Sequence, residues 1–186
     1  GTLLMDAARL GADRLFLLAD RAFAGSDTFA TAKILRRALE VTGPYDLILC
    51  GERAIDGETG QVPGELSAML GLPFLPCGIR LELKDDVLRC RSLQEDGTQT
   101  LEAGLPAVVS ISCGMTGITH PLMPSLRSLR KAREIGLTVL DSRALGFRPE
   151  EVGQSGSLTR VQKTFSPTLT RTCRFVHDAV EGAALT

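Results

Sequence analysis

The chain has 186 residues, of which 44% are hydrophobic and 23% are charged, and its formal net charge is −1. This length and apolar content suit one ordinary domain with a real core, and they exclude disorder throughout. Charges of both signs are interspersed without the basic stripe that nucleic-acid binding needs, and no apolar run approaches the roughly 20 residues of a membrane span.

The first half of the chain alternates between helical spacing and short apolar runs. Glycine and proline close the helices, and Ser26 or Asp27 is placed to cap the second one. Helix and buried strand in alternation are typical of parallel strands joined by right-handed crossovers. Helices are expected at residues 3–10, 26–42 and 64–70, and buried strands at 14–19 and 46–50.

The pattern changes after residue 70. Prolines and acidic turns separate β-rich runs, which predicts an antiparallel insertion that leads back into a buried strand. A basic helix with Ser125 as its N-cap and a last strand follow. From Gly146 the chain is polar, and within it only 158–165 has the pattern of an extended segment. The expected strands are 79–83, 87–93, 98–102, 107–112 and 137–140, and the helix is 125–134. The predicted fold class is α/β, with an open, mostly parallel Rossmann-like sheet, helices on both faces, an antiparallel insertion and an extended C-terminal arm.

Cysteine and histidine form no chemical motif in this sequence. The cysteines are scattered and odd in number, which disfavours zinc or a disulfide framework and favours buried thiols. Neither histidine has a nucleophile or carboxylate at catalytic spacing. We therefore expect no metal site and no catalytic residue. The five cysteines are Cys50, Cys77, Cys90, Cys113 and Cys173.

The most informative stretch is the glycine-rich loop that follows the strand at 46–50 and ends at a helix start near Pro63. Glycines let the backbone approach an anion, and free N–H groups at a helix start attract phosphate. The loop is neither GxGxxG nor a P-loop, and many crossover loops bind nothing, so spacing alone leaves both interpretations open. The candidate binding residues here are Cys50, Gly51, Arg53, Ala54, Asp56, Thr59, Gly60, Gln61, Val62 and Pro63.

Two threonines in the second helix complete this set. Thr28 and Thr31 are three residues apart, so they share one face of the first turn and can offer hydroxyls to the same phosphates. Capping of the helix is an equally good interpretation. Asp56 is expected to fix the loop by backbone hydrogen bonds or to bind a ribose hydroxyl, rather than to transfer a proton.

The literal residues of the loop, Gly51 to Gln61 followed by Val-Pro-Gly-Glu-Leu, resemble the nucleotide loop of electron-transfer flavoprotein beta subunits, which carry Gly-x-Gln-Ala-Ile-Asp. A second resemblance runs from Arg91 to Ser110, with an acidic turn and then Leu-Pro-Ala-Val-Val-Ser. Arg53 stands where that family usually has Gln, and Pro63-Gly64 reverses the commoner Gly-Pro order. Arg53 could add a contact to phosphate or face water.

The resemblance implies an electron carrier rather than an enzyme. It implies binding of FAD or AMP, a heterodimer with an alpha subunit, and redox partners such as acyl-CoA dehydrogenases, which Met123 would help to anchor. The loop sequence Ala-Ile-Asp-Gly-Glu-Thr-x-Gln-Val is closer to that of the FAD-binding, electron-bifurcating branch of the family. Cytoplasm, or the mitochondrial matrix in a eukaryote, is the expected location.

The expected division is a nucleotide-binding domain at 1–145 and, at 146–186, an extended arm that packs on the partner subunit. The family's N-terminal strand and loop would be missing or cut away. The alternative is a stand-alone adenine-nucleotide module of the universal-stress-protein type, which predicts neither an antiparallel insertion nor an arm. An ATP-pyrophosphatase type of enzyme would need a Ser-Gly-Gly-x-Asp-Ser-like loop after a first strand, a region outside this sequence.

Overall fold

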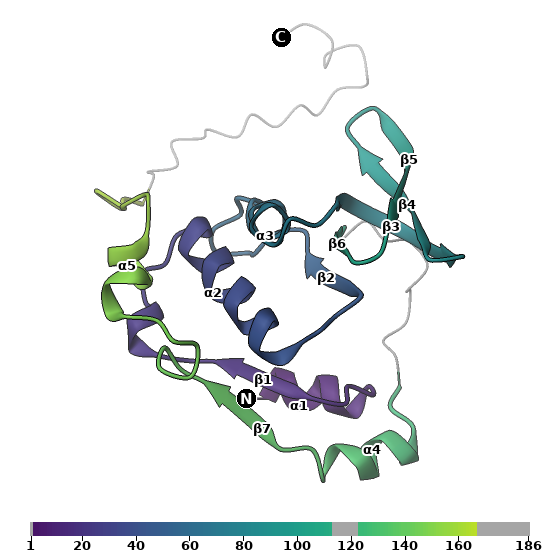
Figure 1. Cartoon of the computed structure of the whole chain (residues 1–186), viewed down its shortest axis with the longest axis horizontal. Helices are drawn as coiled ribbons and strands as arrows, with labels where there is room; N and C mark the ends of the chain where they lie inside the picture. The colour runs from purple at the N-terminus through teal and green to yellow at the C-terminus, as the bar shows by residue number, and fades with distance from the viewer. Residues whose placement is uncertain (1, 113–122, 167–186) are drawn as a thin grey trace, which may run out of the picture.

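The structure is a computed structural model that describes residues 2–112 and 123–166 (Figure 1). It confirms the predicted α/β class, with parallel strands, helices and an antiparallel extension. No helix in these described ranges is long and apolar enough to cross a membrane. The helices are α1 (Thr2–Arg9), α2 (Thr28–Thr42), α3 (Val62–Leu70), α4 (Leu126–Ala132) and α5 (Gly153–Gly156), with short 3-10 turns η1 (Arg21–Phe23) and η2 (Pro149–Glu151). The strands are β1 (Leu15–Leu18), β2 (Leu47–Gly51), β3 (Phe74–Lys84), β4 (Val87–Gln94), β5 (Gly97–Gly104), β6 (Ala107–Ile111) and β7 (Leu137–Leu140).

The strands are distributed over two sheets. β1 and β7 form a two-stranded parallel sheet, in which Leu15 pairs with Leu137 and Leu18 with Leu140. The second sheet has the order β2-β6-β3-β4-β5, with parallel pairing from β2 to β3 and antiparallel pairing from β3 to β5. The amphipathic helix α2 is the crossover from β1 to β2, so these two strands begin at one end of the molecule.

Helices cover both faces of the two-stranded sheet. On one face, Ile34 and Ala38 of α2 pack with Leu140 and with the half-buried Phe16 and Leu18. On the other face, Leu15 packs with Ala8 of α1 and Ala132 of α4. The sides alternate because successive side chains of a strand point to opposite faces.

Strand β3 belongs to two kinds of ladder. Its first residues, Phe74 and Leu75, pair parallel with β6, and from Gly78 it pairs antiparallel with β4. The change occurs at a bulge, where Cys77 has a φ of +49°. The expectation of a strand beginning at residue 79 was therefore wrong, because the strand runs through Pro76 and absorbs the irregularity at the bulge.

Strand β2 lies at the edge of the five-stranded sheet. The sequence predicted a buried strand, but Leu49 is 56% exposed and only β6 pairs with β2 in the described part of the chain. The apolar run identifies the strand correctly. It carries no information about how many neighbours the strand has.

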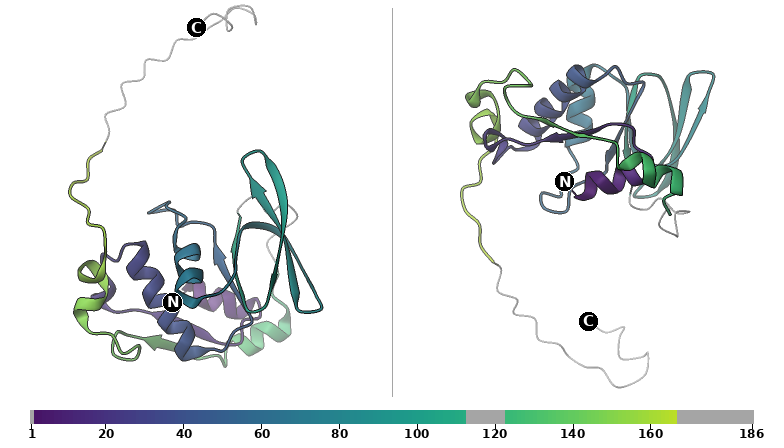
Figure 2. Two further views of the ribbon diagram at one scale, coloured as in Figure 1. Left: turned by 45° about the horizontal axis from the view of Figure 1, so that its top comes forward. Right: turned by 90° about the horizontal axis from the view of Figure 1, so that it is seen from below.

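The polar C-terminal stretch is not extended from its start. Val152 is buried and Phe147 packs on the core formed by α2 and β7, so residues 147–156 lie against the body of the molecule. The chain becomes extended only from Ser157, and Figure 2 shows the segment up to residue 166 running away from the helices. The domain boundary at 145/146 stays a prediction.

Candidate functional site

The carboxyl ends of β1 and β2 lead to the starts of α2 and α3, and the structure brings these two helix starts together. Thr28, the first residue of α2, places its Oγ1 3.2 Å from Oε1 of Gln61 and 3.1 Å from Oε1 of Glu65. In open α/β sheets, ligands bind outside the carboxyl ends of parallel strands. Thr28 and Gln61, both predicted from sequence, therefore meet where that rule places a ligand.

Glu65 was not predicted. A threonine hydroxyl carries one proton and cannot donate to two acceptors, so turning the Gln61 amide gives a consistent chain in which Gln61 Nε2 donates to Thr28 and Thr28 donates to Glu65. The second oxygen of Glu65, Oε2, is buried without a hydrogen-bond partner among the described residues. An acidic residue in the first turn of α3 was the available sequence signal, because helix starts favour negative charge.

The loop between β2 and α3 is exposed but internally braced. The side chain of Ile55 is fully exposed, while the N–H of Glu58 donates to the carbonyl of Ala54 at 3.0 Å. Asp56 Oδ1 accepts from the N–H of Gly57 at 2.8 Å, which is the loop-fixing contact expected of it. Gly60 has a φ of +65°, a conformation that glycine adopts without steric cost.

Arg53 is paired with acidic neighbours. Its guanidinium lies 3.2 Å from Glu52 and 3.7 Å from Glu58, and its side chain is 52% exposed. Exposed ion pairs of this kind contribute little to stability. The guanidinium is therefore at the surface of the loop and able to exchange these carboxylates for another anion at low cost.

The start of α3 differs from that of α2. Asp27 caps α2, because its Oδ1 accepts from the N–H of Ala30 at 2.9 Å. Gln61 precedes α3 with helical backbone angles, and its side chain caps none of the first-turn N–H groups. Pro63 has no N–H, which leaves those of Val62 and Gly64 as the donors of this turn. An anion suits this start better than that of α2.

The remaining predicted residues lie outside the contact that Thr28 makes with Gln61 and Glu65. Ala54 and Thr59 are exposed in the loop, and Thr31 is half-buried one turn after Thr28 with its N–H bonded to the Asp27 carbonyl. Cys50 is half-buried at the end of β2, and burial raises the pKa of its thiol. Met123 is 87% exposed just before α4. No hydrogen bond from Thr31 or Met123 to the loop is observed among the described residues.

A second cysteine also lies beside the loop. The N–H of Cys77 donates to Ser110 Oγ at 2.9 Å, and Ser110 is the register partner of Cys50. Burial raises the pKa of the Cys77 thiol, the Glu52 carboxylate raises it further, and Arg53 opposes this. The sequence could not place Cys77 here because its position depends on the bulge in β3.

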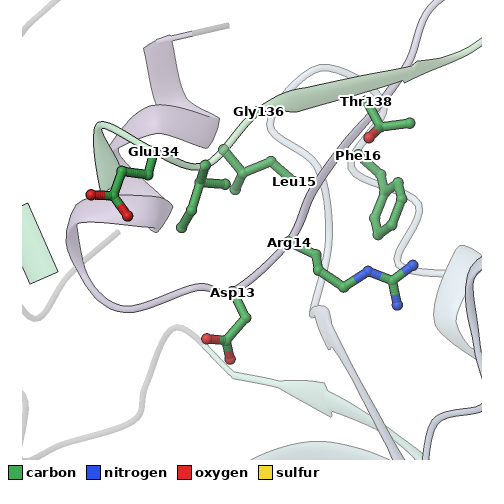
Figure 3. A pocket seen from close by; sticks show the side chains of 8 residues that line it. Asp13, Arg14, Leu15, Phe16, Glu134, Gly136 and Thr138 are labelled. Carbon is green, nitrogen blue, oxygen red and sulfur yellow. The ribbon is translucent and has the colours of Figure 1, made fainter. Parts of the chain in front are cut away.

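A separate cavity of about 350 Å³ lies at the amino ends of β1 and β7 (Figure 3). Arg14, a cationic residue that lines this cavity, already has partners. It donates to the carbonyl of Thr42 at 3.0 Å, and its guanidinium lies 4.7 Å from the ring centroid of Phe16. The cavity is at the opposite end of the parallel strands from the loop. The described residues hold no group of three or more His, Cys, Asp or Glu side chains that could bind a metal ion.

Comparison with known proteins gives a consistent set of relatives. Residues 1–132 match the electron transfer flavoprotein domain. The chain is 32% identical over 170 residues to "Electron transfer flavoprotein subunit beta" of Megasphaera elsdenii, covering 88% of this chain and 62% of that protein. It is 34% identical to the protein of the same name from Thermoanaerobacterium thermosaccharolyticum, covering 90% and 64%. It is 32% identical to "Caffeyl-CoA reductase-Etf complex subunit CarD" of Acetobacterium woodii, covering 89% and 62%. The chain therefore spans somewhat less than two thirds of the length of these relatives.

Proposed function

Because this chain belongs to the electron transfer flavoprotein domain family, we propose that it acts as a beta subunit that binds an adenine nucleotide, FAD or AMP. With an alpha subunit it shuttles electrons between dehydrogenases and an acceptor. The observation that carries the nucleotide site is the start of α3, which has no side-chain cap and lies beside the Thr28 hydroxyl at the carboxyl ends of parallel strands. A cytoplasmic location, or the matrix in a eukaryote, goes with this function.

The residues around the loop fit a phosphate-containing ligand. The N–H groups of Gly60, Gln61, Val62 and Gly64 supply donors for the phosphates, and the exposed guanidinium of Arg53 supplies positive charge. Cys50 and Gly51, at the end of β2, would lie beside the adenosine. When bound, a flavin supplies the electron chemistry, while the protein supplies orientation and electrostatics.

Of the two nucleotides, FAD is favoured. The loop sequence is closer to that of the FAD-binding branch of the family. Exposed apolar side chains supply the partner contacts: Met123 for a redox partner, and those of the extended segment for the alpha subunit. The latter are Leu158, Val161 and Phe165, each at least 75% exposed.

The test is to purify the chain together with its alpha subunit, release the bound nucleotides and identify them by absorbance and mass. Two flavins per heterodimer support the FAD assignment, and one flavin with AMP assigns AMP to this chain. Absence of both a nucleotide and a heterodimer would overturn the proposal.

A pair of loop variants assigns the nucleotide to this loop. Gly60→Ala places a side chain at a φ of +65°, a strain of about 1–2 kcal/mol, so we expect nucleotide affinity to fall roughly five- to thirtyfold. Gly57→Ala is the matched control, because Gly57 lies outside the left-handed region and a Cβ there meets nothing within 4 Å. Equal affinities of the two variants, measured by isothermal titration, would remove the loop from the site.

A further inference from the structure

Asp27 joins two distant parts of the molecule. Its Oδ1 caps α2 through the N–H of Ala30, at 2.9 Å. Its Oδ2 accepts from the N–H and the Oγ1 of Thr159, at 2.9 and 3.1 Å, and its own N–H donates to Ser157 Oγ at 2.9 Å. One side chain therefore fixes both the first turn of a core helix and a segment 132 residues further along the chain.

The contacts made from the extended segment end at this point. Ser157 Oγ also donates to the carbonyl of Gly153, which ties it to α5. Among the described residues 160–166, no hydrogen bond or ion pair to the body of the molecule is observed, and Val161 and Phe165 are 79% and 80% exposed. The bonds between Asp27 and Thr159 thus set the direction in which residues 160–166 leave the molecule. From here on, the arm means these residues and not the whole of 146–186.

The candidate nucleotide site begins one residue further along α2. Thr28 follows Asp27 directly, and its hydroxyl contacts Gln61 and Glu65 at the start of α3. A ligand that orders Gln61 and Thr28 also orders the backbone that carries Asp27. Conversely, a fixed arm holds Asp27, and with it the first turn of α2, in the geometry that presents Thr28 to the site.

We propose that Asp27 is a positioning residue that couples the arm to the nucleotide site, so that nucleotide binding and fixation of the arm at Thr159 favour each other. This inference rests on the proposed nucleotide-binding function. Coupling between two sites is reciprocal by thermodynamic necessity, so each event changes the equilibrium of the other by the same factor. For a link of two hydrogen bonds we expect a factor of about five to ten.

The experiment uses the full chain with FAD and, separately, with AMP as probes. Arg160 directly follows Thr159 and is exposed, so the rate of trypsin cleavage after Arg160 reports how firmly Thr159 is held. In the unmodified chain, saturating nucleotide should slow this cleavage about five- to tenfold, by the factor given above. Asp27→Asn keeps an oxygen that caps α2, since Asn is as good an N-cap as Asp, but it loses the second acceptor for Thr159.

We expect Asp27→Asn and Thr159→Val to bind nucleotide more weakly and to lose most of the protection, since each removes part of the link. Thr164→Val is the matched control, because Thr164 is exposed in the same arm and makes no observed bond with the described residues. If FAD or AMP binds the unmodified chain and cleavage is not slowed, the coupling is refuted while the nucleotide site stands. If neither FAD nor AMP binds, the proposed nucleotide-binding function is refuted, and the coupling that rests on it is refuted too. Unchanged protection in both variants would also overturn the role of Asp27.

Discussion

At the scale of single residues, Asp20 makes the stability of the fold depend on pH. Its Oδ2 accepts from the hydroxyl and the N–H of Ser142, at 2.5 and 2.9 Å, and its Oδ1 accepts from the N–H of Ala22 at 3.0 Å. These bonds, that from the Ser142 hydroxyl first, lower the pKa of Asp20 from 3.8 to about 2. A carboxyl with a lowered pKa stabilises the fold above its unfolded pKa, and this contribution is lost as the pH falls toward 2.

Replacing Asp20 by Asn should therefore flatten the acid limb of the stability curve. Denaturant unfolding between about pH 5 and pH 2 should show a steeper loss of unfolding free energy in the unmodified chain than in Asp20→Asn. Asp6→Asn serves as the control, because the Asp6 side chain is exposed and bonds only to Arg9 in the described structure. Parallel curves for the unmodified chain and Asp20→Asn would show that the bonds to Ser142 do not persist in solution.

Residue by residue, sequence reasoning placed local features well and distant ones poorly. Ser125 and Asp27 cap the helices they were expected to cap, because capping depends on the next three residues. Glu65 and Cys77 were missed as neighbours of the site. Glu65 contacts a residue 37 positions earlier, and Cys77 lies at a bulge whose position no spacing rule predicts.

At the scale of elements, the hairpin between β3 and β4 has a turn that its sequence does not favour. Asp85 and Asp86 form a two-residue loop with φ of +49° and +62°, and both are exposed. Such turns prefer Asn-Gly, since both central residues are left-handed. Asp86→Gly should raise the unfolding free energy by roughly 0.5–1 kcal/mol, and a thermal melt measures this.

Asp86→Ala, at the same exposed position, should change the unfolding free energy in the opposite direction. Alanine has no side-chain group to support the left-handed conformation, so it should destabilise the hairpin by a similar amount, about 0.5–1 kcal/mol. A stabilising effect of alanine would show that the turn has a different geometry in solution.

Elements were predicted well where their signal is periodic. The helices 3–10, 26–42 and 64–70 and the strands 87–93 and 98–102 match the structure to within one or two residues. The strand at 79–83 was cut short because Pro76 normally argues against a strand interior. The segment at 158–165 was expected to be extended and is so, but it pairs with no strand in the described structure.

At the scale of the whole molecule, the exposed edge of β2 should govern self-association. An edge strand rich in apolar side chains offers unpaired backbone groups to another chain, and charged residues on such edges prevent this. Leu49→Lys should therefore raise the monomer fraction at high concentration, as measured by light scattering, while changing stability by no more than about 0.5 kcal/mol.

Val161→Lys is the control for this effect, since Val161 is even more exposed but lies outside any strand. If it raises the monomer fraction and Leu49→Lys does not, association proceeds through the arm and not through β2. The division of the strands into two sheets was beyond prediction, because an apolar run reports burial in general and not which strand lies beside it.

Strand β3 pairs with β6 along its first residues and with β4 further along. This division separates the part of the sheet that tolerates change from the part that does not. The first residues of β3 pair with β6, whereas the ribbon of β4 and β5 contacts the rest of the protein mainly through β3 itself. A fluorophore, affinity tag or inserted peptide at the turn of Asp85 and Asp86 would therefore be held away from the rest of the protein by the paired strands. That tip is the place to attach a reporter with which the proposed electron transfer can be followed.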